Sequence, residues 1–145
     1  MIAALVLDSP VLDWTEVIKT NCTRSGLPAA AGYLAVPWLT IEPLARLVGL
    51  PGRIPLRSFD WTARAADLST PTLILHGAQD DSVSIQLSQA LRDARPELVE
   101  LDTFDADHTL AWNTGPGRWH AETTEWLSAR EIGRASCRER VSIDV

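Results

Sequence analysis

Two segments of the chain carry residue types that could perform nucleophilic chemistry. Asp80 stands three residues after Gly77, which ends the apolar run Thr72–His76, and the pair Asp107–His108 follows the next apolar run. A carboxylate on one ring nitrogen of a histidine fixes the tautomer and stabilises the imidazolium. The other ring nitrogen can then take the proton of a nucleophile. The acid and the histidine are two of the three members of a nucleophilic triad.

Three short apolar runs predict the strands that would position these groups. They are Ala3–Leu7, Thr72–His76 and Leu98–Leu101, and helical patterns over Ile85–Ala94 and Trp119–Arg130 follow the second and third. This order predicts an α/β fold with parallel strands and right-handed crossovers. Functional groups on such sheets gather at the carboxyl ends of the strands, which is where the acids and His108 fall.

A long connection separates the first strand from the second. Residues 26–58 hold five prolines and four glycines, and short helical patterns are predicted for Ala31–Trp38 and Glu42–Val48. Proline in a helix interior costs about 3 kcal/mol, so short helices are expected here. Helix periodicity resumes over Phe59–Leu68. We expect the six tryptophans to pack, with Trp38 and Trp61 as candidates to line a pocket.

Taken together, these segments resemble the C-terminal part of an α/β-hydrolase. The resemblance covers residues 1–130 and is carried by LVLDSPVLDW, PTLILHGAQDDSVS and DADHTLAWNTGPGRWHAETTEWL. It is strongest to bacterial members of the lysophospholipase and serine-peptidase-like branch. It implies about three parallel strands with flanking helices, and a cap-like helical connection over about residues 14–68.

The resemblance assigns roles to the acid and the histidine. It places Asp80 at the triad acid and His108 at the triad base, in the order Ser, Asp, His that these enzymes follow. Asp81 is the competing candidate for the triad acid. Asp8 is a further candidate, because some relatives take the triad acid from the strand that follows the nucleophile. His76, at a strand end, is interpreted as a packed histidine.

The nucleophile of that family has no counterpart in the chain. Its G-x-S-x-G elbow is expected upstream of the first strand, and no such pentapeptide occurs between Met1 and Val145. Ser9 precedes Pro10 and is interpreted as a turn residue. We therefore expect a fragment of a serine hydrolase that cleaves ester, thioester or peptide bonds, with the acid and base but without the nucleophile. The alternatives are a non-catalytic α/β binding or regulatory module, and a fragment of an Asp-nucleophile hydrolase of the dehalogenase or epoxide hydrolase type.

Composition and charge indicate which classes of partner to expect. The formal net charge is −6 with no basic run, which disfavours nucleic acid as a partner. The apolar start at Ile2–Leu7 is too short for a membrane span and lacks the flanks of a signal peptide. The three histidines, of which His120 lies on the last helix, lack metal-binding spacing, so no metal or cofactor is predicted. The expected partner is a small ester or peptide substrate.

The C-terminal end differs from the rest of the chain. Residues 131–145 begin with EIGRASCRERV, which is polar and aperiodic and follows a completed helical pattern. This segment resembles the translation of a sequencing adapter, and we predict that it is not native to the protein.

Overall fold

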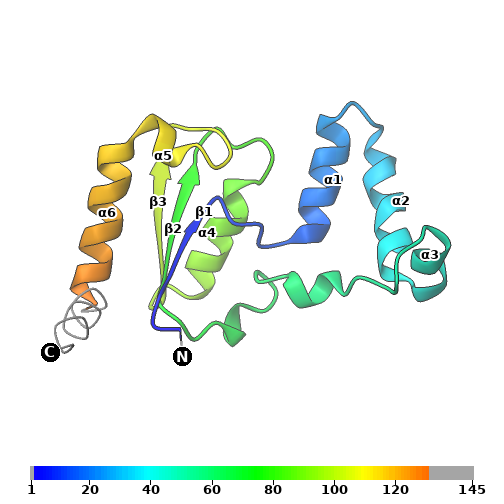
Figure 1. Cartoon of the computed structure of the whole chain (residues 1–145), viewed down its shortest axis with the longest axis horizontal. Helices are drawn as coiled ribbons and strands as arrows, with labels where there is room; N and C mark the ends of the chain where they lie inside the picture. Colours follow the sequence, from blue (N-terminus) through cyan, green and yellow to red (C-terminus); the bar gives the residue numbers. More distant parts are fainter. Residues whose placement is uncertain (1, 131–145) are drawn as a thin grey trace, which may run out of the picture.

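The computed structural model describes residues 2–130 and has an α/β fold with one parallel sheet (Figure 1). The strands are β1 (Leu5–Asp8), β2 (Thr72–Gly77) and β3 (Val99–Phe104), in the order β1-β2-β3. Because β2 is central, it is buried along its whole length and needs apolar side chains on both faces. The predicted three-stranded parallel α/β fold is therefore confirmed.

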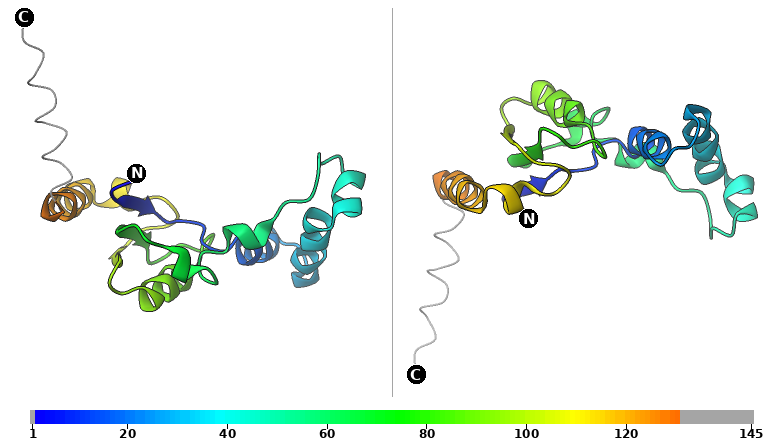
Figure 2. Two further views of the ribbon diagram at one scale, coloured as in Figure 1. Left: turned by 90° about the horizontal axis from the view of Figure 1, so that it is seen from below. Right: turned by 90° about the horizontal axis from the view of Figure 1, so that it is seen from above.

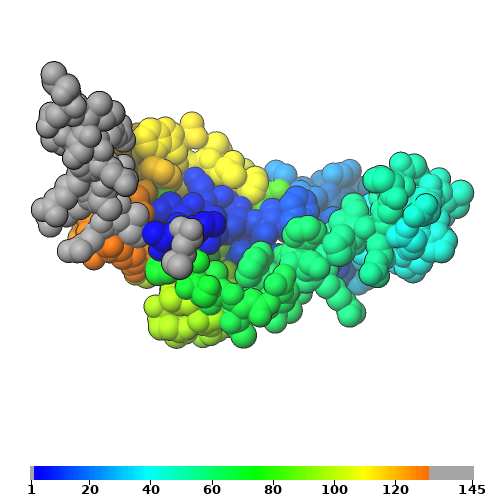
Figure 3. Space-filling model, turned by 60° about the horizontal axis from the view of Figure 1, so that its bottom comes forward, coloured from blue at the N-terminus to red at the C-terminus, as the bar shows by residue number. Residues whose placement is uncertain are grey.

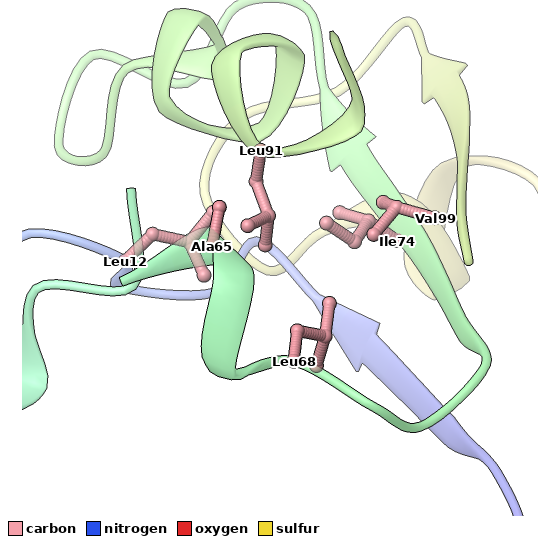
Figure 4. Close-up of a cluster of buried hydrophobic side chains, with 6 residues drawn as sticks. All are labelled: Leu12, Ala65, Leu68, Ile74, Leu91 and Val99. Carbon is pink, nitrogen blue, oxygen red and sulfur yellow. The ribbon is translucent and has the colours of Figure 1, made fainter. Parts of the chain in front are cut away.

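Helices cover both faces of the sheet (Figure 2). On one face, Ile74 of β2 packs against Leu91 of α4 (Ile85–Ala94) in the cluster shown in Figure 4. On the other face, Leu73 and Leu75 pack with side chains of α5 (Ala111–Thr114) and α6 (Pro116–Ala129). Fully burying each such side chain stabilises the fold by about 1.5–3 kcal/mol. The alternation along β2 also directs His76 to the α4 face.

A helical arm extends sideways from the sheet between β1 and β2 (Figures 1 and 3). We define the arm as residues 14–59. It contains α1 (Trp14–Arg24), α2 (Ala29–Thr40), α3 (Glu42–Leu47) and the short 3-10 helix η1 (Leu56–Phe59). The Asp13 carboxylate caps α1 by accepting the Thr15 and Glu16 N–H groups.

One glycine and one proline, Gly32 and Pro37, shape the helices of the arm. A Cβ on Gly32 would lie 2.6 Å from the Lys19 Cα, so glycine is what lets α2 approach α1 closely. The helix α2 continues three residues past Pro37 to Thr40, further than the sequence pattern predicts.

Two sequence-based expectations were wrong. Phe59–Leu68 forms turns and the 3-10 helix η2 (Ala65–Asp67) rather than a continuous helix. Trp14, Trp38 and Trp112 are 40–47% exposed, because they lie on the arm and on α5 rather than between a helix and the sheet. Trp126 follows the expectation and is buried in the α6 face of the core.

No helix within residues 2–130 is both long enough and apolar enough to span a membrane. The predicted foreign segment, residues 131–145, lies outside the described residues.

Candidate active site

The loops that follow β2 and β3 meet beyond the carboxyl ends of these strands. Their backbones are joined by hydrogen bonds from Ala78 N–H to the Phe104 carbonyl at 2.7 Å and from Gln79 N–H to the Ala106 carbonyl at 3.0 Å. Gln79 Nε2 also donates to the Asp105 carboxylate at 2.7 Å. The loop that holds Asp80 and the loop that holds His108 are thus fixed to one another.

Asp80 and His108 form a direct pair across these loops. His108 Nδ1 lies 2.8 Å from Asp80 Oδ2, a distance typical of a strong charge-assisted hydrogen bond. The side chain of Asp80 is fully buried, and that of His108 is 35% exposed. Within residues 2–130, His108 Nε2 has no hydrogen-bond partner. The geometry therefore leaves one ring nitrogen held by a carboxylate and the other free to exchange a proton.

The second oxygen of Asp80 fixes its own loop. Oδ1 accepts the N–H groups of Ser82 at 3.0 Å and Val83 at 2.8 Å. An aspartate that binds its own backbone two and three residues on holds a tight turn. One oxygen thus anchors the carboxylate, and the other is available to orient His108.

Asp81 points away from the pair. It is 61% exposed and forms an ion pair with Arg24 of α1 at 2.9 Å. His120 is exposed on α6, where its Nδ1 lies 3.5 Å from the Thr124 hydroxyl. Neither residue contributes to the geometry around His108 in the described chain.

Ser9 occupies a strained turn at the end of β1. Its φ is +46°, a left-handed value that is uncommon for residues other than glycine, and the residue is buried. Its hydroxyl accepts the Thr109 N–H at 3.3 Å, which links the end of β1 to the loop that holds His108. The turn conformation agrees with the interpretation of Ser9 as a turn residue.

The pKa values of Asp8 and Asp80 shift in opposite directions. For Asp80, burial opposes ionisation, but the Val83 N–H, the His108 ring and the Ser82 N–H outweigh it, so the pKa is lowered. For Asp8, burial raises the pKa, and the nearby Trp119, Ser9 and histidines offset it only in part. Asp8 Oδ1 is buried without a hydrogen-bond partner among the described residues. The pKa shifts favour Asp80 over Asp8 as the carboxylate that stays ionised beside an imidazolium.

These shifts predict opposite pH dependences for two matched variants. Because the pKa of folded Asp80 lies below its unfolded value of about 3.9, its stabilisation is present above that value and is lost as pH falls through the folded pKa. Asp80→Asn should therefore lower the unfolding free energy most near neutral pH, with a deficit that shrinks on acidification.

For Asp8 the sign reverses, since a raised folded pKa penalises the folded state at neutral pH. Asp8→Asn should be more stable than the wild type near pH 7, and the gain should vanish below the unfolded pKa of about 3.9. Urea unfolding between pH 3 and 7 measures both. Parallel stability curves for the wild type and the two variants would contradict these assignments.

Sequence reasoning missed two sets of contacts around the Asp80 loop. Asn21 of α1 donates to the Ser82 carbonyl at 2.9 Å and accepts the Ser82 hydroxyl at 3.1 Å, which docks the arm on this loop. His76 lies behind Asp80, with Nε2 at 3.4 Å from Asp80 Oδ2. The 61-residue separation of Asn21 and Ser82 leaves no sequence signal, whereas a histidine at the end of the strand before the acid is a signal that could have been followed.

Comparisons with known proteins support the fold and a distant relationship. No family model matches the chain. A proline iminopeptidase of Levilactobacillus brevis is 30% identical over 76 residues, which are 52% of this chain and 25% of that protein. An esterase structure from Pyrococcus furiosus matches with a TM-score of 0.56 at 17% identity, over 88% of this chain and 45% of that one.

The chain therefore spans about a quarter of the iminopeptidase and less than half of the esterase. The structural match extends to the fold alone, because its sequence identity is low. Together, the two likenesses indicate a distant relationship to α/β-hydrolases.

Proposed function

We propose that this chain supplies the acid and the base of a serine hydrolase triad, Asp80 and His108, for the cleavage of ester, thioester or peptide bonds. The observation that carries the proposal is the 2.8 Å contact between His108 Nδ1 and the buried Asp80 Oδ2, with Nε2 free of partners among residues 2–130. The names of the two similar proteins, an iminopeptidase and an esterase, agree with acyl-bond cleavage.

In the proposed reaction, a serine outside this sequence attacks the carbonyl carbon of the substrate. His108 Nε2 takes the hydroxyl proton, and Asp80 stabilises the imidazolium through Nδ1. The protonated His108 then gives its proton to the leaving alcohol, thiol or amine. Water, activated by the same nitrogen, releases the acyl group and restores the serine. The donors that stabilise the tetrahedral oxyanion also come from outside the sequence.

The proposal includes a role for the connection over residues 14–68 as a cap over the substrate. An apolar pocket of about 420 Å³ lies inside the arm. Its walls are Trp14, Ile18, Leu39, Ile54, Leu56 and Phe59. Trp38 and Trp61, which the sequence suggested as pocket residues, do not line this pocket. Because its walls offer almost no polar atoms, it suits the apolar part of an acyl group.

Because the proposed serine nucleophile is not part of this sequence, the 145-residue chain by itself should not hydrolyse substrates through a triad. Its turnover of p-nitrophenyl butyrate should equal the buffer rate, since the sequence has no G-x-S-x-G nucleophile. Release of p-nitrophenol, followed by absorbance, measures this. Turnover that disappears in a His108→Ala variant would mean that a residue within the chain acts as the nucleophile, contrary to the proposal.

The sequence encoded directly upstream provides the complementary test. If it contains an in-frame G-x-S-x-G, the extended chain should hydrolyse the same ester. An upstream nucleophile of the Asp type would change the proposed reaction, and an in-frame stop would favour a binding module.

A further inference from the structure

His76 is a titratable side chain beside Asp80, and the proposed reaction gives it no role. It is the penultimate residue of β2, on the face covered by α4, and is completely buried. Both ring nitrogens are engaged, with Nδ1 at 2.8 Å from the Ser88 hydroxyl of α4 and Nε2 at 3.0 Å from the Val83 carbonyl. A buried histidine with two such partners is held in one ring orientation.

The partners of His76 determine which ring nitrogen carries the proton. Nε2 faces two oxygens that can only accept, the Val83 carbonyl and Asp80 Oδ2, which lies 3.4 Å away. A lone pair on Nε2 would be repelled by both oxygens, so the proton is on Nε2. Nδ1 then accepts the hydrogen of the Ser88 hydroxyl, which can donate or accept. The neutral Nε2–H tautomer satisfies every contact.

This tautomer places a polarised N–H beside Asp80. Oδ1 accepts the Ser82 and Val83 N–H groups and Oδ2 accepts His108 Nδ1–H, whereas His76 Nε2 lies 3.4 Å from Oδ2 and donates its hydrogen bond to the Val83 carbonyl instead. The positive end of the His76 N–H therefore stabilises the ionised carboxylate by proximity rather than as a hydrogen-bond donor. His76 also holds the carbonyl of Val83, the same residue whose N–H binds Oδ1. Rotation of the carboxylate or movement of its loop would break one of these contacts.

We propose that His76 is a positioning residue for the triad acid, which fixes the direction of the Asp80 carboxylate and thereby the tautomer of His108. This inference rests on the proposed function, since it gives a role to His76 only if Asp80 and His108 act as a pair. His76 touches no substrate in this assignment.

The test uses the ring nitrogens of the full 145-residue chain labelled with nitrogen-15. Nitrogen-15 spectra of histidine rings report which nitrogen bears the proton, and the exchange of that proton with water reports how firmly it is held. The wild type should show His76 protonated on Nε2 and His108 protonated on Nδ1 at neutral pH. A His76 proton on Nδ1 would overturn the proposal without the need for any variant.

Three variants separate positioning from simple packing. His76→Phe keeps an aromatic ring but removes the Nε2–H, and should speed exchange of the His108 Nδ1 proton by about fivefold, as expected when the one neutral hydrogen bond to the Val83 carbonyl is lost. His76→Gln retains an amide donor at a similar reach and should stay within about twofold of the wild type. Ile74→Val, a buried change on the same strand and face, should leave the His108 proton unchanged.

The outcomes show whether the proposed function or only the role of His76 has failed. If Asp80→Asn leaves the His108 ring as in the wild type, the proposed pair itself is wrong. If Asp80→Asn alters the His108 ring but folded His76→Phe behaves like Ile74→Val, only the role of His76 is wrong. Should His76→Phe fail to fold, the wild-type protonation of His76 and the behaviour of His76→Gln decide.

Discussion

If the proposed function is right, replacing Asp80 with asparagine should lower kcat by roughly 10⁴-fold in an active enzyme that contains this chain and the proposed upstream serine. The amide keeps the shape of the carboxylate but removes its charge, and its NH₂ group can donate to His108 Nδ1. The ring would then carry its proton on Nε2, the nitrogen that must accept the serine proton. His108→Ala should lose at least as much activity. Hydrolysis of p-nitrophenyl butyrate under saturating substrate measures both effects.

Asp81→Asn is the matched control for this prediction. It is the same chemical change one residue away, on a side chain that is 61% exposed and paired with Arg24 rather than with His108. An exposed ion pair contributes about 0–1 kcal/mol, so kcat should stay within about threefold of the wild type. A large loss in Asp81→Asn together with a small loss in Asp80→Asn would reverse the assignment of the acid.

The largest expected effect on folding comes from Gly77, at the end of β2. A Cβ on this residue would lie 2.3 Å from the Ala106 carbonyl oxygen and 2.6 Å from the Asp107 carbonyl oxygen. Both atoms belong to the backbone just before His108, so the clash cannot be relieved by a side-chain rotation. Gly77→Ala should therefore lower the free energy of unfolding by about 3 kcal/mol, the upper end of the usual range for overpacking.

Gly117, within α6, offers the contrasting substitution. A Cβ there would meet no atom within 4 Å, so Gly117→Ala should be neutral or stabilise the protein by up to about 1 kcal/mol. Urea unfolding at neutral pH compares the two variants. Equal stability of Gly77→Ala and the wild type would show that the loops carrying Asp80 and His108 are not packed as closely as described.

The sequence predicts well those elements whose pattern depends on local chemistry. The helix α4 begins and ends at the predicted residues, because Ser84 caps it and its apolar face repeats with helical period. The strand β3 is longer than predicted, and extends to Phe104, because the apolar run stops at Leu101 while the edge strand continues through polar residues. Edge strands tolerate polar side chains on their exposed face.

The site shows the same division between local and long-range information. The spacing of Asp80 after Gly77 and the position of His108 after a strand predict two groups at the same edge of the sheet. The Asp80 loop is held by Asn21, which bonds Ser82, and by His76, which bonds Val83 and is itself oriented by Ser88. The docking of α4 and the arm on this loop depends on three-dimensional packing and leaves no local pattern in the chain, whereas His76, next to the end of the strand before the acid, is a local signal.

The most direct test of the central claim is the protonation of the His108 ring in the wild-type chain and in Asp80→Asn, measured by nitrogen-15 spectra. We predict a proton on Nδ1 in the wild type, a switch to Nε2 in Asp80→Asn, and no change in Asp81→Asn. A His108 ring that is protonated on Nε2 in the wild type, or that ignores the Asp80 substitution, would contradict the assignment of Asp80 and His108 as acid and base.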